Sequence, residues 1–136
     1  MVLLSRITRW VQRDVIAQCN AMGVTATQFA ILEVLDSKGE LSVGDIERLI
    51  LSTPGNVPYV INNLCKKGWA KRENSHHDKR VTLVSLTPEG TAKIDAIRPI
   101  HDRILTEAFS ALSFKEKREL SRMLFTIYRQ NERSKR

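Results

Sequence analysis

The chain has 136 residues, of which 27% are charged and 42% hydrophobic, with a net charge of +7. This composition is that of one soluble globular domain, and no apolar run approaches the roughly 18 residues of a membrane span, which argues against a membrane protein. The first residues, 1–6, become polar too early for a signal peptide, so we expect a cytoplasmic location. Cys19 and Cys65 are too few and too far apart for a disulfide framework or a metal knuckle.

The first two helices are predicted from apolar residues that recur at helical spacing. Gly23 ends the first helix, and Thr25 with Gln28 forms a capping box that begins the second. The segment 36–39 closes the second helix. The apolar stripes are Leu4, Ile7, Val11, Val15 and Met22 in the first helix, and Phe29, Leu32 and either Val34 or Leu35 in the second.

Two short helices follow, separated by a tight turn. Ser42 and Asp45 predict a capping box at the start of the first, and residues 52–56 form the turn before the second. The second ends at Lys66-Lys67-Gly68, where cations in the last turn precede a glycine. The residues expected to point inward are Ile46, Leu49 and Ile50 in the first helix, and Val57, Val60, Ile61 and Leu64 in the second.

Pro58 is the least expected residue of the second short helix. If Thr53 is the N-cap, Pro58 lies in the second turn and removes a backbone hydrogen bond, at a cost of about 3 kcal/mol. If Asn56 is the N-cap, Pro58 falls at the second helical position and costs little. We therefore expect a helix that starts late or bends at its N-terminal end.

Next, the hydrophobic period changes from that of a helix to that of strands. Residues 69–73 and 80–86 alternate like two strands, and the polar segment 74–79 forms a hairpin tip between them. Thr87-Pro88 restarts a helix, which Pro99 is expected to kink near Arg98. Ser113 and Glu116 form a third predicted capping box. The stripes of these last two helices are Ile94, Ile97, Ile104 and Ala108, and then Leu120, Leu124 and Ile127.

Two short helices followed by a charged hairpin predict a winged helix-turn-helix, a mainly α fold with a small β-hairpin. The second helix fits a DNA major groove if it presents small or hydrogen-bonding side chains outward, because amides can bond adenine and hydroxyls reach phosphates. Its expected outward residues are Thr53, Asn56, Tyr59, Asn62, Asn63 and Lys66.

The hairpin supplies positive charge beside that helix. Residues 65–80 contain six cations and two anions, so +4 of the chain's +7 lies within sixteen residues. A protruding basic tip suits a narrow minor groove, where the negative potential is strong. A solvated hairpin with charged edge strands is the alternative, and the position of the cations beside the helix favours DNA.

The chain resembles the MarR (multiple antibiotic resistance regulator) family over essentially its whole length. The resemblance rests on 25–29 through Leu35, on Thr53-Pro54-Gly55-Asn56 leading to 60–64, and on 66–69. Its most specific part is Asp78-Lys79-Arg80 followed by Leu86-Thr87-Pro88-Glu89-Gly90.

This resemblance implies a homodimer that binds duplex DNA at a near-palindromic operator, usually as a repressor. Residues 1–24 and 88–136 would form the dimerisation helices and residues 25–87 the DNA-binding lobe. A small aromatic ligand entering a cleft between these parts would release the DNA. Arg80 matches the family's minor-groove arginine, and Asp78 the acid that supports its loop. The implied DNA-binding residues are Ser52, Thr53, Gly55, Asn56, Tyr59, Asn62, Asn63, Lys66, Lys79 and Arg80.

Pro58 departs from the Thr or Ser that is usual in the family, which puts the DNA sequence read in doubt rather than the class. Cys19 does not match the cysteine through which some members sense oxidants. Adjacent His76 and His77 on a hairpin tip cannot easily share a metal ion, so we expect no metal and no cofactor. The chain has no Gly-rich phosphate loop or nucleophile elbow, so we expect no enzyme. A winged-helix module that binds protein rather than DNA is the alternative function.

Overall fold

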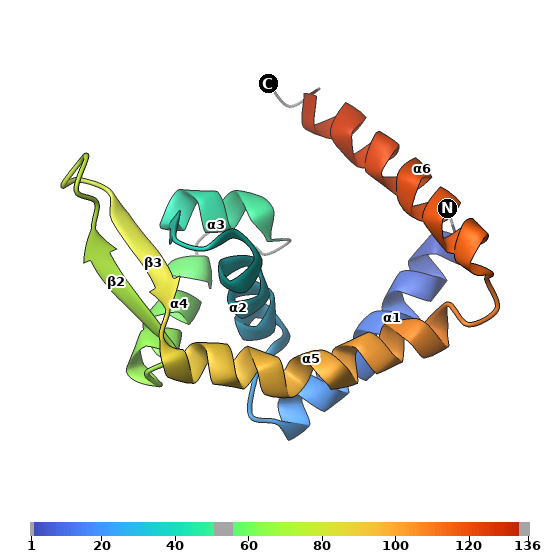
Figure 1. Cartoon of the computed structure of the whole chain (residues 1–136), viewed down its shortest axis with the longest axis horizontal. Helices are drawn as coiled ribbons and strands as arrows, with labels where there is room; N and C mark the ends of the chain where they lie inside the picture. The colour runs from blue at the N-terminus through green and yellow to red at the C-terminus, as the bar shows by residue number, and fades with distance from the viewer. Residues whose placement is uncertain (1, 51–55, 134–136) are drawn as a thin grey trace.

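The computed structural model describes residues 2–50 and 56–133, with side chains to residue 131. A lobe at one end holds short helices and a small sheet, and long helices lead away from it to the other end (Figure 1). This mainly helical architecture with a hairpin confirms the predicted fold class. The helices are α1 (Val2–Ala21), α2 (Ala26–Lys38), α3 (Val43–Leu49), α4 (Asn56–Lys66), α5 (Pro88–Ala108) and α6 (Phe114–Arg133), and the strands are β1 (Leu41–Ser42), β2 (Ala70–Asn74) and β3 (Thr82–Leu86).

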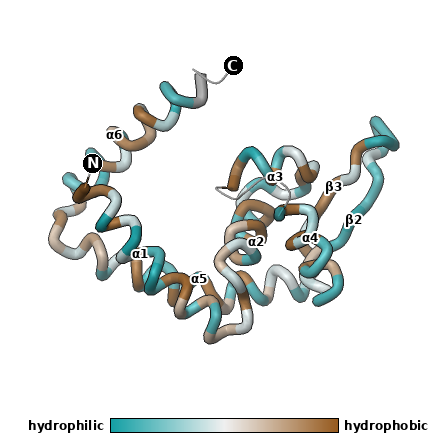
Figure 2. Tube along the Cα trace, turned by 180° about the vertical axis from the view of Figure 1, so that it is seen from behind, coloured by the Kyte–Doolittle hydropathy of each residue, from teal (hydrophilic) through white to brown (hydrophobic). Residues whose placement is uncertain are grey.

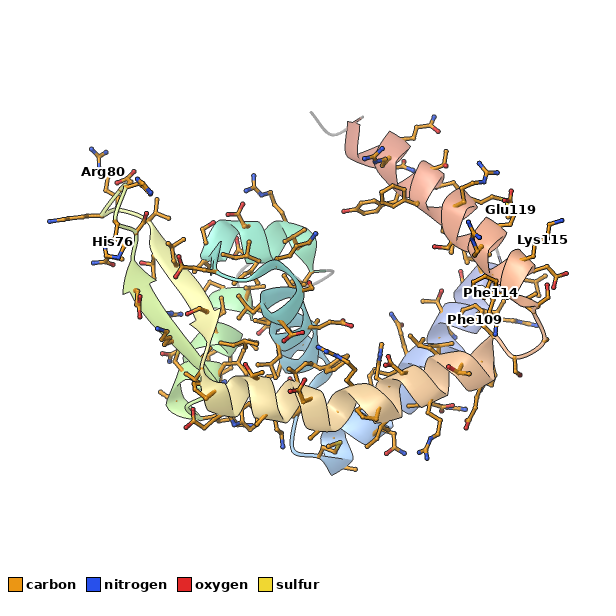
Figure 3. The ribbon with its side chains drawn as sticks, in the orientation of Figure 1. His76, Arg80, Phe109, Phe114, Lys115 and Glu119 are labelled. Carbon is orange, nitrogen blue, oxygen red and sulfur yellow. The ribbon has the colours of Figure 1, made fainter. Side chains whose placement is uncertain are left out.

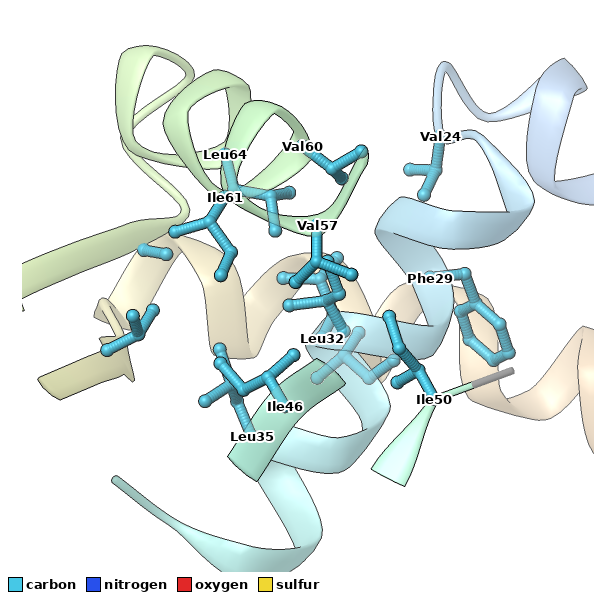
Figure 4. Close-up of a cluster of buried hydrophobic side chains, with 14 of the residues drawn as sticks. Val24, Phe29, Leu32, Leu35, Ile46, Ile50, Val57, Val60, Ile61 and Leu64 are labelled. Carbon is cyan, nitrogen blue, oxygen red and sulfur yellow. The ribbon is translucent and has the colours of Figure 1, made fainter. Parts of the chain in front are cut away.

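The hydrophobic core lies in the lobe, where α2, α3 and α4 converge (Figure 4). The apolar face of α4 is buried as its stripe predicts, since Ile61 and Leu64 are fully buried. Phe29, Leu32 and Leu35 are buried on α2, and Val34 is half-buried beside them. The prediction that Leu49 points inward is wrong, because Leu49 is 43% exposed. Ile46 and Ile50 are buried as predicted.

Two of the three predicted capping boxes form. Thr25 Oγ1 accepts from the Gln28 N–H at 3.2 Å, and Gln28 Oε1 accepts from the Thr25 N–H at 3.0 Å. Ser113 and Glu116 make the same pair of bonds at 3.3 and 2.7 Å. Ser42 caps α3, but the Asp45 carboxylate accepts from the Ser42 hydroxyl at 2.6 Å instead of from its backbone N–H, so the second box is incomplete.

The sheet has three antiparallel strands in the order β1-β3-β2. The hairpin strands were expected, but β1 was not, because two residues carry no alternation that a sequence pattern could detect. Leu41 pairs with Val84, so β1 covers one edge of β3 while β2 covers the other. This pairing fixes the base of the hairpin against the helical lobe, and its hydrophilic tip projects beyond (Figure 2).

α5 begins at Pro88, the first helical position, with Thr87 as its N-cap. It continues as one helix through Pro99, and its course bends near the middle, where Pro99 lies (Figure 1). The buried Ile94 and Ile97 pack its first half against the core, and Arg98 forms an ion pair with Asp36 of α2. α5 therefore links the lobe to the far end of the molecule.

α6 turns back from the end of α5, and its C-terminal end points toward the side of the molecule on which the lobe lies (Figure 1). Leu124 and Ile127, predicted to point inward, are 43% and 58% exposed. Leu124 borders an open cleft between α5 and α6, so this face of α6 is only partly covered within the described part of the single chain. No single described helix is long and apolar enough to span a membrane; only α1 and α2 taken together pass that test, and they are bent by 90°.

Candidate DNA-binding interface

The outer face of α4 carries four of the ten residues predicted to contact DNA. Burial of the apolar stripe turns Asn56, Tyr59, Asn62 and Lys66 outward, and all four are exposed, Tyr59 by 65%. They recur every three or four residues and therefore form one face of the helix. Asn63, at the edge of this face, is less exposed than these four residues and is half-buried. The predicted contacts Ser52, Thr53 and Gly55 lie outside the described residues.

Pro58 lies in the first turn of α4, the third residue of a helix that begins at Asn56. The backbone N–H groups of the first turn have no intrahelical acceptor, so a proline there removes no hydrogen bond. The Pro58 carbonyl accepts a hydrogen bond of 3.2 Å from Arg72 Nη2 of the neighbouring strand β2. The first turn is thereby tied to the hairpin.

The hairpin tip, which we call the wing tip (residues 75–81), is organised by Asp78 and Ser75. The Asp78 carboxylate accepts from the Arg80 backbone N–H at 3.0 Å, and the Asp78 carbonyl accepts from the Val81 N–H at 2.9 Å. Ser75 Oγ accepts from the His77 N–H at 3.2 Å, and the Ser75 N–H donates to the Val81 carbonyl. These bonds hold the backbone while the Arg80 side chain points outward from the tip (Figure 3).

The six cations of residues 65–80 have different roles in the structure. Lys67, Lys71 and Arg72 each contact groups of the protein itself. Lys66, Lys79 and Arg80 are exposed, and their side chains make no ion pair or hydrogen bond with any described residue. The positive charge available to a polyanion is therefore concentrated at the end of α4 and at the wing tip.

Lys71 is neutralised by a neighbour on the same strand. Its Nζ lies 2.7 Å from Glu73 Oε1, two residues along β2 and on the same face. The hydrogen bond and charge of Lys71 hold the pKa of Glu73 below its usual range, and Glu73 raises the pKa of Lys71. Both charges belong to the hairpin's net charge, but they interact mainly with each other.

The other end of α4 is anchored to the long helices through Trp69. Lys67 Nζ and Lys93 Nζ lie 4.5 and 5.0 Å from the centre of its ring. Lys67 also donates to the Gly23 carbonyl at 3.2 Å, and Lys93 donates to the Met22 carbonyl at 2.7 Å. This cluster joins the C-terminal end of α4 to the turn after α1 and to α5. The sequence offered no signal for it, since its members are far apart in the chain.

Apolar side chains at the far end of the molecule are uncovered in the single chain. An open cleft of about 580 Å³ lies between α5 and α6 and is lined mainly by apolar residues such as Phe109, Leu120 and Phe125. Hydrophobic stretches alternate with hydrophilic ones along α6 (Figure 2). The large exposed apolar residues of α1 and α6 are Val2, Leu3, Leu4, Ile7, Trp10, Ile16, Phe114, Met123, Leu124, Phe125, Ile127 and Tyr128.

Metal and thiol chemistry find no support in the described residues. These contain no group of three or more His, Cys, Asp or Glu side chains that could hold a metal. Burial raises the pKa of the Cys19 thiol, and it also raises that of Cys65, against the opposing charge of Arg72. Neither environment favours the reactive thiolate.

Comparisons with known proteins agree with this geometry. Residues 22–81 match the model of the MarR family. The chain is 35% identical over 118 residues to the uncharacterised helix-turn-helix-type transcriptional regulator YkoM of Bacillus subtilis, covering 87% of this chain and 77% of that protein.

Two solved structures share the fold. One is a cysteine-to-serine mutant of MarR from Escherichia coli in complex with operator DNA, with a TM-score of 0.80, 21% identity, and coverage of 92% of this chain and 90% of that one. The other is BpsR of Bordetella bronchiseptica, whose DNA binding is regulated by 6-hydroxynicotinic acid, with a TM-score of 0.81, 25% identity, and coverage of 93% and 90%. From the family match, the YkoM alignment and the winged helix-turn-helix geometry, the chain belongs to the MarR family of transcriptional regulators.

Proposed function

We propose that this regulator binds duplex DNA as a homodimer at a near-palindromic operator in the cytoplasm and represses transcription there. The observation that carries the proposal is the pairing of an exposed, amide-rich face on α4 with unpartnered cations at the end of α4 and at the wing tip. Both surfaces belong to one lobe, whose core fixes their relative position.

Each surface suits one groove of B-DNA. α4 would enter the major groove, where Asn56 and Asn62 can bond base edges and Tyr59 can reach a base or a phosphate. The wing tip would lie over the adjacent minor groove, with Arg80 inserted and Lys79 near the backbone. Asp78 would act indirectly by holding the Arg80 backbone. Ser52, Thr53, Gly55, Asn63 and Lys66 complete the proposed contact set.

A second copy of the chain is the proposed partner for the exposed apolar faces of α1 and α6. Monomeric soluble proteins rarely expose contiguous apolar patches of this kind, and larger ones mark interaction sites. We therefore assign residues 1–24 and 88–136 to dimerisation and residues 25–87 to DNA binding. A two-fold dimer presents two α4 helices, which predicts an operator with two inverted half-sites.

Regulation by a small aromatic ligand extends the proposal. BpsR, of the same fold, is controlled by 6-hydroxynicotinic acid. In this chain Phe29 of α2 lies 5.0 Å from His101 of α5, ring centre to ring centre, at the junction between the lobe and the long helices. 6-Hydroxynicotinic acid is thus a reasonable first probe. Release of operator DNA on its addition would support ligand control, whereas no change up to millimolar concentration would count against this ligand.

The test is selection of duplexes from a random pool, followed by a salt titration with the selected site. Three unpartnered cations per protomer give six per dimer, so the logarithm of affinity should fall against the logarithm of salt concentration with a slope of about −5. A symmetric selected site with this slope supports the proposal. Absence of any enriched site, together with capture of a protein partner at a salt-independent affinity, would favour the protein-interaction module instead.

A further inference from the structure

Arg72 lies between the two surfaces proposed to bind DNA. In the register of the sheet it faces the fully buried Val84, and Ala70, two residues earlier on β2, is buried as well. Alternate residues of a strand share a face, and paired residues on adjacent strands lie on the same face. Arg72 therefore projects from the core side of the hairpin, toward α4, whereas Lys71 and Glu73 project from the opposite side.

Its guanidinium contacts α4 through one hydrogen bond. Nη2 donates to the Pro58 carbonyl at 3.2 Å. The charge of Arg72 also lowers the pKa of the Cys65 thiol, which burial raises. Pro58 and Cys65 are seven residues apart, so they lie on the same face of the helix about 10 Å apart along its axis. The Arg72 side chain is exposed, and its guanidinium reaches the Pro58 carbonyl in the first turn of α4.

The bond to Pro58 lies in the turn of α4 that carries two of the proposed DNA contacts. Pro58 falls between Asn56 and Tyr59, two of the residues proposed to face the major groove. Within the described ranges 2–50 and 56–133, this is the only hydrogen bond from a side chain of the hairpin strands to α4. It therefore connects the turn carrying the major-groove residues with the strand that leads to the wing tip.

Resting on the proposed function, we propose that Arg72 is a positioning residue that fixes the first turn of α4 relative to the wing, so that both DNA contacts share one register. Its guanidinium is engaged by the protein and does not neutralise a phosphate. This separates Arg72 from Lys66, Lys79 and Arg80, whose charges are available to DNA.

The test compares Arg72→Met with Lys71→Met. Each variant removes one cation from adjacent positions of β2 and keeps an unbranched side chain, but only the first removes the donor to Pro58. Affinity for the selected operator should fall about five- to tenfold in Arg72→Met, as for one weak hydrogen bond lost in each protomer of the dimer, and less than twofold in Lys71→Met. Affinity for unrelated DNA and the salt slope should stay the same, so that the ratio of specific to non-specific binding falls.

Two results would overturn the proposal. Equal weakening on both DNAs with a shallower salt slope would make Arg72 a phosphate contact, and unchanged operator affinity would leave it no role in binding. A readout without DNA separates this proposal from the proposed function: the Pro58 carbonyl ¹³C and Tyr59 amide resonances of the free protein should move in Arg72→Met and not in Lys71→Met. If the wild-type protein selects no operator, the proposed function fails, while unmoved resonances would refute the contact itself.

Discussion

Replacing Arg80 by Ala isolates the contribution of the wing tip to DNA binding. The Arg80 side chain is exposed and has no partner among the described residues, and it is the backbone N–H, which alanine keeps, that Asp78 holds. The substitution should therefore change the free energy of unfolding by no more than about 0.5 kcal/mol, as is usual for a surface site.

The effect on operator affinity should be large by comparison. A dimer presents two copies of Arg80, so the substitution removes two cations from the complex and should make the salt slope shallower by about two. At about 1 kcal/mol per half-site, the loss is about 2 kcal/mol per dimer, or roughly thirtyfold in Kd. Fluorescence anisotropy of a labelled duplex, measured at several salt concentrations, gives both quantities.

Lys115→Ala is the matched control. Lys115 is an exposed cation at the start of α6, at the opposite end of the molecule from Arg80 (Figure 3). The Lys115→Ala substitution lowers the net charge by the same amount as Arg80→Ala, so any effect of total charge should appear equally in both variants. Titration curves for Arg80→Ala that coincide with those of Lys115→Ala would refute the assignment of the wing.

Three further substitutions test other parts of the account. Asp78→Ala removes the acceptor for the Arg80 N–H, so operator affinity should fall about fivefold at an unchanged salt slope. The same anisotropy assay measures both quantities. A shallower slope would show that charge rather than loop geometry had changed. Gly90→Ala places a methyl group against the Trp69 backbone carbonyl, so urea unfolding should show that the free energy of unfolding falls by about 1–3 kcal/mol. Thr91→Ala, at an exposed neighbour, should be nearly neutral. Equal effects of the two substitutions would contradict the close packing. Hydrogen bonds from Ser113 lower the pKa of Glu116, so its contribution to stability is present above the ordinary carboxyl pKa of about 4 and is lost as pH falls through the lowered value. The difference in stability between the wild type and Glu116→Gln, measured by thermal unfolding, should shrink in that range. A difference independent of pH would contradict the assignment.

Local signals in the sequence predicted most of the helical framework. The Thr25–Gln28 and Ser113–Glu116 boxes place reciprocal donors and acceptors three residues apart, a relation that needs no tertiary contact. Gly23 and Gly68 occupy positive φ angles of 72° and 74° after helix ends, where glycine is favoured. Such features are encoded within one turn of chain, which is why reading along the sequence finds them.

Other features depend on which segments meet in space. The hairpin's net charge was visible in the sequence, but the pairing of Lys71 with Glu73 and of Arg72 with the Pro58 carbonyl was not, because each follows from the face of β2 on which a residue lies. Leu49 fits the helical stripe of α3 and is still 43% exposed, since that helix is short and its last turn lies at the edge of the core. Leu124 also belongs to an apolar stripe, but it is 43% exposed because α5 covers that face of α6 only in part, across an open cleft, in the described part of one chain.

The most direct test of the central claim is footprinting of the selected operator with dimethyl sulfate, which methylates guanine N7 in the major groove and adenine N3 in the minor groove. The account predicts N7 protection within each half-site from α4 and N3 protection beside it from the wing, with only the N3 protection lost in Arg80→Ala. Protection confined to one groove, or N3 protection that persists in Arg80→Ala, would contradict it.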